Sequence, residues 1–592
     1  MRSAAGWSIF DEIVGRLRYY LWRYRLWYLA GALCLLVTAT LVMWIPWWIR
    51  EAVRIIERGG SLGDVTYYAV LIGVAAVAQG LVRTYSRAMI FNAGRNVEYD
   101  LRNDLFAHLE KLPLSFYQSQ RTGDLMSRVI NDISAVRIML GPGILSLVNA
   151  PLYYVYALAL MLSMDVRMTL AALTPLALLL FAARRFRGGI MKTSLEVQQQ
   201  MSALSSHAQE NLSGMHVVKA FTQEPFQIRQ FIALNRDYQA KSMELARMRG
   251  IVSPILQGIN GLTVLIVIWY GGIRVVRGDL LVADIVAFIA YLNVLSWPTA
   301  AFGWVFSLVE RGRAAMKRLE EIFKTQPEIA NPSTPLPVRG LKEGVEFRNV
   351  SFAYDRQKNG HGALEGINFS LRVGRTVGFV GRIGSGKSTV AQLVPRLFDC
   401  SSGEILIDGQ DIRKLSLREL RRTLGYVPQD PFLFSMSLRR NLAFGRDEVS
   451  DEALERAVTI AKLDRDLQIF PQGLDTLVGE RGVTLSGGQK QRATLARALL
   501  MDAPVLILDD CLSSVDAQTE AEILQGLKSI LGEKSCLIIS HRISAVKGAD
   551  EILVLDDGKI IERGTHEELV QRGGVYAELY QQQQLSEELE QI

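Results

Sequence analysis

The stretch Gly381-Arg382-Ile383-Gly384-Ser385-Gly386-Lys387-Ser388-Thr389 decides the fold of the second half of the chain. It has the spacing G-x-x-x-x-G-K-[ST], follows an apolar, strand-like run at 376–380 and precedes an apolar, helix-like run at 390–398. A strand, a glycine-rich loop and a helix in this order form a phosphate-binding P-loop. The glycines let backbone N–H groups surround a phosphate, and the helix turns its positive end toward the same anion.

Individual residues of this loop have distinct predicted roles. Lys387 is expected to hold the β and γ phosphate oxygens of a nucleotide, and Ser388 is expected to be a Mg²⁺ ligand. The alternative is a glycine-rich turn that binds nothing. The predicted phosphate-binding residues are Gly381, Gly384, Ser385, Gly386, Lys387, Ser388 and Thr389.

Length and composition indicate two dissimilar domains. The 592 residues are too many for one hydrophobic core. Of these residues 49% are apolar and 21% are charged, which fits a membrane part joined to a soluble part. The net charge of +6 suits loops near anionic lipid and is too small to predict a nucleic-acid partner. Four scattered cysteines without metal-binding spacing are expected to be reduced thiols: Cys34, Cys400, Cys511 and Cys536.

Six stretches of the first half lack charged residues and predict membrane-spanning helices. Four of them exceed the roughly 20 residues that cross a hydrocarbon core. The second and fourth are shorter, but charged helical sequence follows each, so both helices are expected to continue into the cytosol. Buried helices of a large soluble domain are the alternative. The stretches are 26–49, 65–82, 138–164, 168–183, 251–273 and 285–309.

The distribution of lysine and arginine predicts the orientation of these spans. Both residue types are concentrated before the first span and in the segments 83–137 and 184–249, whereas the other connections are short and carry few. The positive-inside rule therefore places both termini in the cytoplasm. Residues 9–24 predict an amphipathic helix at the membrane interface. Charges and aromatic residues precede the first span, so no cleavable signal peptide is expected.

The two long cytoplasmic segments are too helical for simple loops, and helices of that length reach tens of ångströms below the bilayer at ~1.5 Å per residue. Gly123 and Gly214, at their tips, are expected to end helices. Three aromatic residues at the tips are candidates either for docking into a groove or for local packing: Phe116, Tyr117 and Phe221.

Polar residues within the spans are few, and none is charged: Gln79, Asn149, Gln257, Asn260 and Asn293. Polar groups at membrane depth bond a neighbouring helix or line a cavity. Without Asp, Glu, Lys or Arg in the spans, nothing indicates a proton relay or a Na⁺ site. An apolar or amphipathic cargo suits such a lining.

The second half carries four further candidate residues. Gln429 ends a strand-like run, where its amide can reach Mg²⁺ and water, and Asp509 ends a continuous apolar strand as the expected Mg²⁺ holder. His541 follows another such strand and can contact a γ-phosphate. Tyr354 follows a strand predicted at 345–353 and either stacks on adenine or is an ordinary surface tyrosine.

A second glycine-rich anion cradle lies at Leu485-Ser486-Gly487-Gly488-Gln489, ahead of a helix-like run at 490–500. Two such cradles in one chain are hard to satisfy with a single nucleotide.

Taken together, these motifs resemble those of ATP-binding cassette (ABC) exporters, over essentially the whole chain. The resemblance implies an α-helical membrane domain with six spans, fused to an α/β P-loop ATPase domain, in the inner (plasma) membrane. The implied boundaries are an interfacial helix at 1–25, the membrane domain at 26–310, a proline-containing linker at 311–344 and the ATPase domain at 345–592.

The resemblance also implies roles for the motifs. It makes Leu485, Ser486, Gly487, Gly488 and Gln489 the signature motif, Tyr354 the adenine-stacking residue and His541 the switch histidine. ATP and Mg²⁺ are the implied cofactors, with Ser388, Gln429 and Asp509 as metal ligands. Such proteins work as dimers that clamp ATP between one subunit's P-loop and the other's signature, which explains the two cradles. The tips of the cytoplasmic segments would be coupling helices.

One residue departs from the family's pattern. After the Mg²⁺ aspartate the family usually places a glutamate as general base, and here Asp510 stands there. A carboxylate withdrawn by ~1 Å or more can cost on the order of 10²-fold in rate. The D-loop Ser513-Ser514-Val515-Asp516 also departs from the commoner sequence. Both features resemble the degenerate half of bacterial heterodimeric exporters of the Mdl-like multidrug type. The alternative is a homodimer in which Asp510 is a somewhat slow base.

The expected function is therefore one half of a heterodimeric, ATP-driven exporter of lipophilic or amphipathic compounds, with Asp510, His541 and Gln429 as catalytic residues. A second ABC half-transporter and membrane lipids are the expected partners. An ATP-gated channel or regulator is the alternative, and a soluble DNA- or ribosome-associated ATPase is excluded by the spans.

Overall fold

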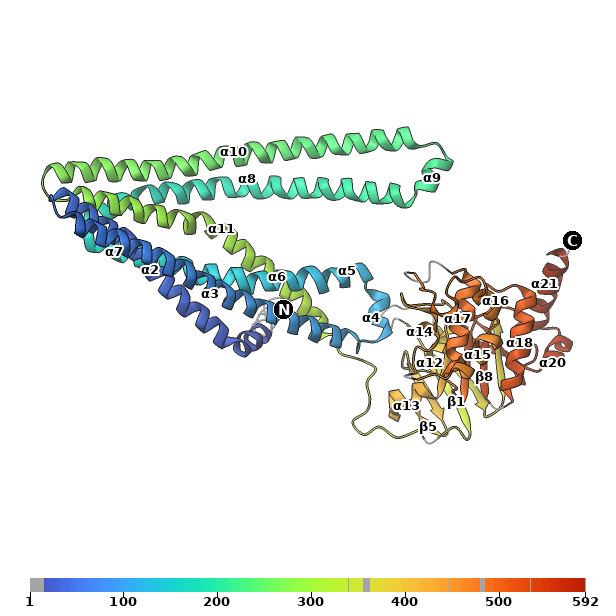
Figure 1. The fold of residues 1–592 in the computed structure, drawn as a ribbon. Helices are drawn as coiled ribbons and strands as arrows, with labels where there is room; N and C mark the ends of the chain where they lie inside the picture. The colour runs from blue at the N-terminus through green and yellow to red at the C-terminus, as the bar shows by residue number, and fades with distance from the viewer. Residues whose placement is uncertain are drawn as a thin grey trace. The chain divides into compact units, whose positions relative to one another are not determined.

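The computed structural model describes residues 15–338, 340–354, 362–446, 448–479, 485–532 and 534–590 (Figure 1). The chain divides into two compact units. One unit comprises residues 1–106 and 126–324, and the other comprises residues 107–125 and 325–592.

The first unit is built from long helices (Figure 1). Within it α8 and α10 lie side by side, and the short helix α9 joins them at one end. The helix from Thr122 to Met164 contains α5, α6 and α7 with two π-helical turns between them. The helices between residues 25 and 324, of which α4 and the start of α5 belong to the other unit, are α2 (Arg25–Glu57), α3 (Leu62–Leu109), α4 (Leu114–Ser119), α5 (Thr122–Ser127), α6 (Ile133–Ile138), α7 (Ile144–Met164), α8 (Val166–Ser213), α9 (Met215–Ala220), α10 (Glu224–Val276) and α11 (Val282–Lys324).

Among the described residues, five helical segments are long and apolar enough to cross a membrane: Arg25–Glu57, Leu62–Leu109, Thr122–Met164, Gln257–Val276 and Val282–Lys324. The span predicted at 168–183 lies within α8, where several side chains fall outside the described part of the chain. The prediction that the second and fourth helices continue beyond their apolar stretches is confirmed by the lengths of α3 and α8.

The two tip glycines behave differently. Gly214 ends α8 and donates its N–H to the carbonyl of Glu210, as predicted. The prediction for Gly123 is wrong, because this residue lies in the first turn of α5. The helix that precedes it, α4, ends at Ser119 instead. In addition α11 continues to Lys324, so the first part of the predicted linker is helical.

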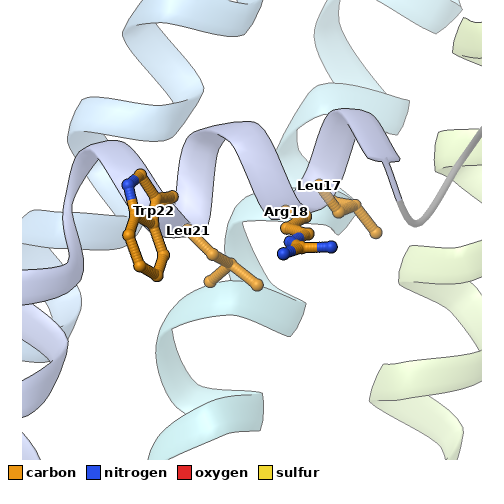
Figure 2. A pocket seen from close by; sticks show the side chains of 4 residues that line it. All are labelled: Leu17, Arg18, Leu21 and Trp22. Carbon is orange, nitrogen blue, oxygen red and sulfur yellow. The ribbon is translucent and has the colours of Figure 1, made fainter.

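The chain enters the first span through a helix at 15–23. Tyr20 on this helix is 1% exposed and donates a hydrogen bond to Asp104 Oδ2 at 2.6 Å. Leu17, Leu21 and Trp22 line an open pocket together with Arg18 (Figure 2). A face of apolar, tryptophan and arginine side chains suits a membrane interface. The other part of the helix predicted at 9–24, residues 9–14, lies outside the described residues.

The second unit contains two sheets. The antiparallel one has the order β2-β1-β4-β5, and the other has the order β10-β9-β3-β8-β7-β6, in which every pairing except β10 with β9 is parallel. The bounds of the strands are β1 (Gly344–Phe352), β2 (Leu364–Arg372), β3 (Thr376–Gly381), β4 (Ser402–Ile407), β5 (Gln410–Asp411), β6 (Leu424–Val427), β7 (Val505–Asp509), β8 (Ser535–Ile539), β9 (Glu551–Asp556) and β10 (Lys559–Gly564).

The helices of this unit pack against the sheets and against one another. Their bounds are α12 (Lys387–Leu393), α13 (Leu417–Arg422), α14 (Leu438–Leu442), α15 (Asp451–Ile460), α16 (Asp464–Leu467), α17 (Gly487–Leu500), α18 (Ala517–Leu531), α19 (Ile543–Val546), α20 (His566–Arg572) and α21 (Val575–Glu590).

The order of the parallel strands brings the predicted motifs together. Every residue of β3, β7 and β8 is buried, which explains their uninterrupted apolar sequences. These three strands are neighbours, with β8 in the middle. The carboxyl ends of neighbouring parallel strands meet at one edge, so the residues that follow β3, β7 and β8 converge there.

Asn441 fixes the segment that follows β6. It is fully buried, accepts a hydrogen bond from Phe434 N–H at 2.8 Å and donates one to Phe434 O at 2.9 Å. Arg497 Nη2 also donates to the Asn441 side-chain oxygen, and Arg497 Nη1 donates to Phe432 O at 2.9 Å. Burial lowers the pKa of Arg497 to about 10.

We predict that Asn441→Leu destabilises the ATPase domain. The change leaves the backbone of Phe434 and one Arg497 nitrogen without partners, and an unsatisfied buried group costs about 1–3 kcal/mol. Calorimetry of the purified full chain is expected to show an unfolding midpoint lowered by roughly 5–10 °C for a domain of this size. Asn331→Ala is the control, because exposed Asn331 accepts a single bond, from Leu417 N–H. Equal unfolding midpoints for the two variants would contradict the role of Asn441 in fixing the segment after β6.

Candidate functional site

The P-loop connects β3 to α12, and two of its glycines are required by close backbone approach. Gly381 and Gly386 have φ of +152° and +99°. A Cβ at Gly381 would lie 2.0 Å from Leu555 O, and one at Gly386 would lie 2.4 Å from Ala363 O. Gly384, with φ of +85°, needs glycine for its conformation alone. The loop therefore has a compact backbone whose N–H groups can surround a phosphate group.

Lys387 lies folded over this loop. Its Nζ donates hydrogen bonds to Gly381 O at 2.8 Å and to Arg382 O at 2.7 Å, and lies 3.3 Å from Ser385 Oγ. Burial lowers the pKa of Lys387, and the carboxylates of Asp510 and Asp509 oppose this shift. The ammonium group is thus held at the phosphate-binding position by neutral oxygens that a phosphate can replace.

Ser388, Gln429 and Asp509 converge at the same edge of the sheet. Ser388 Oγ donates to Asp509 Oδ1 at 2.8 Å and lies 3.3 Å from Gln429 Oε1. Asp509 is 1% exposed, its Oδ2 has no hydrogen-bond partner, and burial raises its pKa to about 6. A hydroxyl, an amide oxygen and a carboxylate with one unused oxygen are suitable ligands for Mg²⁺, so these residues fit the ion.

Asp510 and His541 form a pair beside this group. Asp510 Oδ1 lies 2.8 Å from His541 Nδ1, and Asp510 N–H donates to Ile539 O at 2.8 Å. The backbone of Asp510 is left-handed, with φ of +47°, a conformation that aspartate tolerates better than most residues. The imidazole remains 47% exposed.

Tyr354 is tied to the P-loop helix. Its hydroxyl lies 3.0 Å from Thr389 Oγ1 and donates to Gln392 Oε1 at 3.2 Å. The ring meets Phe352 and Phe398 edge-on and is about half exposed. A half-exposed tyrosine held at its hydroxyl is suited to stacking on a flat base.

The signature residues form the start of α17. Ser486 Oγ accepts a hydrogen bond from Gln489 N–H, and Gln489 Oε1 accepts one from Ser486 N–H, which is a complete capping box. Gln489 Nε2 also donates to Asp466 Oδ1 at 2.9 Å. The side chain of Gln489 is therefore engaged in positioning this helix, and the side chain of Leu485 is buried in the core. Ser486 and Gly487 remain exposed at the helix N-terminus.

The signature packs closely on the D-loop of its own chain. A Cβ at Gly488 would lie 2.9 Å from Ser514 O. Gln491, 3% exposed, donates to Ser513 Oγ and accepts a hydrogen bond from Ser514 N–H, each at 2.9 Å. Ser513 Oγ in turn donates to the carbonyl of Asp510 at 3.0 Å. The D-loop thus links the signature of this chain to its own P-loop edge.

The two cradles themselves are separate. Among the described residues, no hydrogen bond or ion pair joins 381–389 to 485–489. One lies at the end of β3 and the other at the start of α17. Each offers backbone N–H groups at a helix N-terminus, an arrangement suited to binding an anion.

Sequence reasoning missed three residues that support this edge. Arg542 bonds Glu520 and the carbonyls of Ser513 and Val515, while Gln491 and Gln583 bond backbone groups of the D-loop and of the His541 loop. Arg542 and Gln491 lie next to recognised motifs in the sequence, so their position could have identified them as supporting residues. Gln583 lies far from any motif in the sequence, and no local pattern indicates its role.

Two families of known proteins match this chain, one in its first half and one in its second half. Residues 28–299 match the ABC transporter transmembrane region, and residues 364–513 match the ATP-binding part of ABC transporters. The chain is 34% identical to a probable multidrug resistance ABC transporter ATP-binding/permease protein of Bacillus subtilis, over 97% of this chain and 98% of the relative. It is 35% identical to the multidrug resistance-like ATP-binding protein MdlA of Escherichia coli, over 95% of each.

A solved structure, that of a bacterial Atm1-family ABC exporter with ATP bound, is similar with a TM-score of 0.76 and 27% identity, over 96% of this chain and 98% of that one. The helical membrane region, the α/β ATPase region and the nucleotide motifs therefore occur in one polypeptide, as in an ATPase coupled to transport. On these grounds the chain belongs to the ABC transporters, with its transmembrane and ATP-binding regions fused.

Proposed function

We propose that the chain is one half of a heterodimeric, ATP-driven exporter, located in the inner membrane with both termini in the cytoplasm. The observation that carries the proposal is the pair of separate half-sites together with Asp510. Each half-site needs the complementary half from another subunit, because a nucleotide held by the P-loop alone has one face uncovered. The membrane domain, at 26–310, would move cargo, and the ATPase domain, at 345–592, would drive the movement.

In this mechanism ATP binds to the P-loop of this chain with its base against Tyr354. Lys387 holds the phosphates, and Ser388, Gln429 and Asp509 hold Mg²⁺. The bound ion neutralises charge that develops on the phosphates during transfer. The signature of the partner subunit covers this nucleotide, and Ser486 and Gly487 of this chain cover the nucleotide of the partner.

Hydrolysis at this chain's own site is proposed to be slow. The base position carries Asp510, whose shorter side chain is already bonded to His541. A base must reach the attacking water within about 2.6–3.2 Å. Withdrawing the carboxylate by one methylene weakens that contact, so the partner's site, which we propose has glutamate, would perform most of the turnover.

Coupling between the two domains is proposed to run through the short tip helices α4 and α9. Residues 107–125, which include α4, belong to the same compact unit as the ATPase domain. Phe116 and Tyr117 lie on α4 and contact each other edge-on. The ATPase domain exposes three aromatic side chains after Gln429, which suits docking of such a helix: Phe432, Phe434 and Phe444.

A cavity of about 80 Å³ in the membrane domain supports an uncharged, amphipathic cargo. It lies among α7, α8, α10 and α11, and none of its lining residues is charged. The hydroxyls of Thr263, Ser296 and Thr299 donate to carbonyls one turn earlier in their own helices. Within the described residues, the amides of Asn260 and Asn293 have no hydrogen-bond partner. These two amides are therefore free to bond a polar group of a cargo.

The heterodimer predicts unequal effects of blocking the two half-sites in the assembly purified from its native membrane. Ser486→Arg fills the cradle that covers the partner's nucleotide, so steady-state ATP hydrolysis is expected to fall roughly 10-fold or more. Lys387→Ala disables only the slow site and is expected to leave most of the hydrolysis. Equal losses, or rapid ATP hydrolysis and transport by this chain alone, would instead indicate a homodimer.

Asp510→Glu is expected to raise turnover at this chain's own site about 10-fold or more, because the carboxylate advances by ~1 Å or more toward the water. The measurement is the hydrolysis that remains in assemblies carrying Ser486→Arg, where the partner's site is blocked. Asp510→Asn, which keeps the length and removes the base, should reduce that remaining rate. A rate unchanged by either substitution would mean that Asp510 does not act as the base.

Asn293→Leu is expected to weaken recognition of uncharged polar amphiphiles. The test compares three compounds with the same twelve-carbon chain: dodecanamide, dodecyltrimethylammonium and dodecanoate. Dodecanamide should stimulate ATP hydrolysis by the reconstituted assembly, and the variant should need several-fold more of it, because one lost hydrogen bond is worth about 0.5–1.5 kcal/mol. Gln79→Leu, outside the cavity lining, is the control. Preferred stimulation by either charged compound would contradict the proposed cargo class.

A further inference from the structure

Gln583, on the C-terminal helix α21, bonds the backbone on both sides of Arg542. Its Nε2 donates to His541 O at 2.5 Å, and its Oε1 accepts a hydrogen bond from Ile543 N–H at 2.8 Å. His541 lies in the turn between β8 and α19 and Ile543 is the first residue of α19, so neither the sheet nor the helix satisfies these two backbone groups. A single amide group therefore supplies both partners and fixes the geometry of this turn.

The same turn connects two other parts of the site. The side chain of His541 lies against Asp510, and the side chain of Arg542 bonds buried Glu520 and two D-loop carbonyls. Ser544 Oγ also donates to Glu520, at 2.7 Å. The residues 541–543 thus face the P-loop edge, the D-loop and α21 at once. The contact with α21 comes from outside the nucleotide motifs, as does the bond from Arg542 to Glu520 on α18.

Fixing the backbone at His541 determines where its imidazole can go. Two side-chain torsions separate the backbone of a histidine from its ring, so the ring position follows the position of Cα and the direction of Cβ. A displacement of about 1 Å in a group that contacts the reacting phosphate can cost on the order of 10²-fold in rate. Supporting residues outside the reacting groups commonly provide this precision.

The start of α21 is anchored without Gln583. Tyr576 is fully buried, its hydroxyl lies 2.7 Å from His566 Nδ1, and Glu562 accepts hydrogen bonds from the N–H groups of Val575 and Tyr576 at 2.6 and 3.1 Å. These contacts lie about two turns before Gln583. Removing the amide is therefore expected to release the His541 turn while the helix remains docked.

We propose that Gln583 is a positioning residue for His541, and that the C-terminal helix α21 thereby sets the rate of ATP hydrolysis at this chain's own site. This role goes beyond the nucleotide motifs and the dimer. It applies equally whether the second subunit is a different chain or another copy, because both contacts lie within one chain.

The test separates ATP binding from hydrolysis on this chain in the full assembly. Photolabelling with 8-azido-ATP on ice reports binding, and vanadate trapping of the labelled nucleotide during turnover reports hydrolysis. Gel separation assigns the label to each subunit. For Gln583→Leu we expect binding within about twofold of the wild type and trapping reduced roughly 10-fold or more, as displacement of a contacting group predicts. Gln584→Leu is the matched control, since among the described residues the side chain of Gln584 bonds only Tyr580 of its own helix.

A double variant decides whether the effect acts through the histidine. If Gln583 works by positioning His541, Gln583→Leu should reduce trapping no further in a His541→Ala background. Equal trapping by Gln583→Leu and the wild type would overturn the proposal. The proposal would also be overturned if Gln583→Leu lost ATP binding and trapping in parallel and had a lowered unfolding midpoint. A full additional loss of trapping by Gln583→Leu in the His541→Ala background would overturn it as well. If the heterodimer proposal is wrong, this would appear separately, as equal losses of ATP hydrolysis in Ser486→Arg and Lys387→Ala.

Discussion

The hydrogen bond from Ser388 Oγ to Asp509 Oδ1 joins the start of α12 to the end of β7 across the parallel sheet. It exists because β3, β8 and β7 are neighbours whose carboxyl ends meet at one edge. A buried carboxylate is costly unless its oxygens are bonded or bind a metal, and here one oxygen has no hydrogen-bond partner. The sheet order therefore brings Ser388 to Asp509, and the loops after the three strands carry the rest of the candidate site.

Around this edge, buried and half-buried polar side chains connect nucleotide motifs to other elements. Gln491 ties the D-loop to α17, Arg542 ties it to the His541 turn, and Asn441 ties the segment after Gln429 to α17 through Arg497. In each case an amide or guanidinium group forms hydrogen bonds with backbone groups that helices and sheets leave unpaired.

The membrane unit is held by a different kind of contact, charged pairs at the ends of long helices. Arg50 at the end of α2 bonds Asp284 at the start of α11, while Arg318 of α11 bonds Asp132 and Arg16 bonds Glu320. Asp132, Asp284 and Glu320 are all buried. Such pairs lie outside the apolar stretches, where the charges cost less than at membrane depth. The cavity in this unit is accordingly lined by apolar, hydroxyl and amide side chains, including Asn260 and Asn293.

The sequence by itself determined the two domain types, the P-loop and the aspartate in place of glutamate at Asp510, because apolar runs, glycine spacing and motif residues are local properties. It also predicted that α3 and α8 continue beyond the membrane stretch. It misplaced the end of a helix at Gly123, since glycine is tolerated in a first turn and α4 ends earlier, at Ser119. Only the tertiary structure decided that Gln489 positions a helix, that Asp510 is bonded to His541 and that Gln583 bonds the turn around it. Such contacts join residues far apart in the chain, and strand order and helix packing, not local pattern, bring them together.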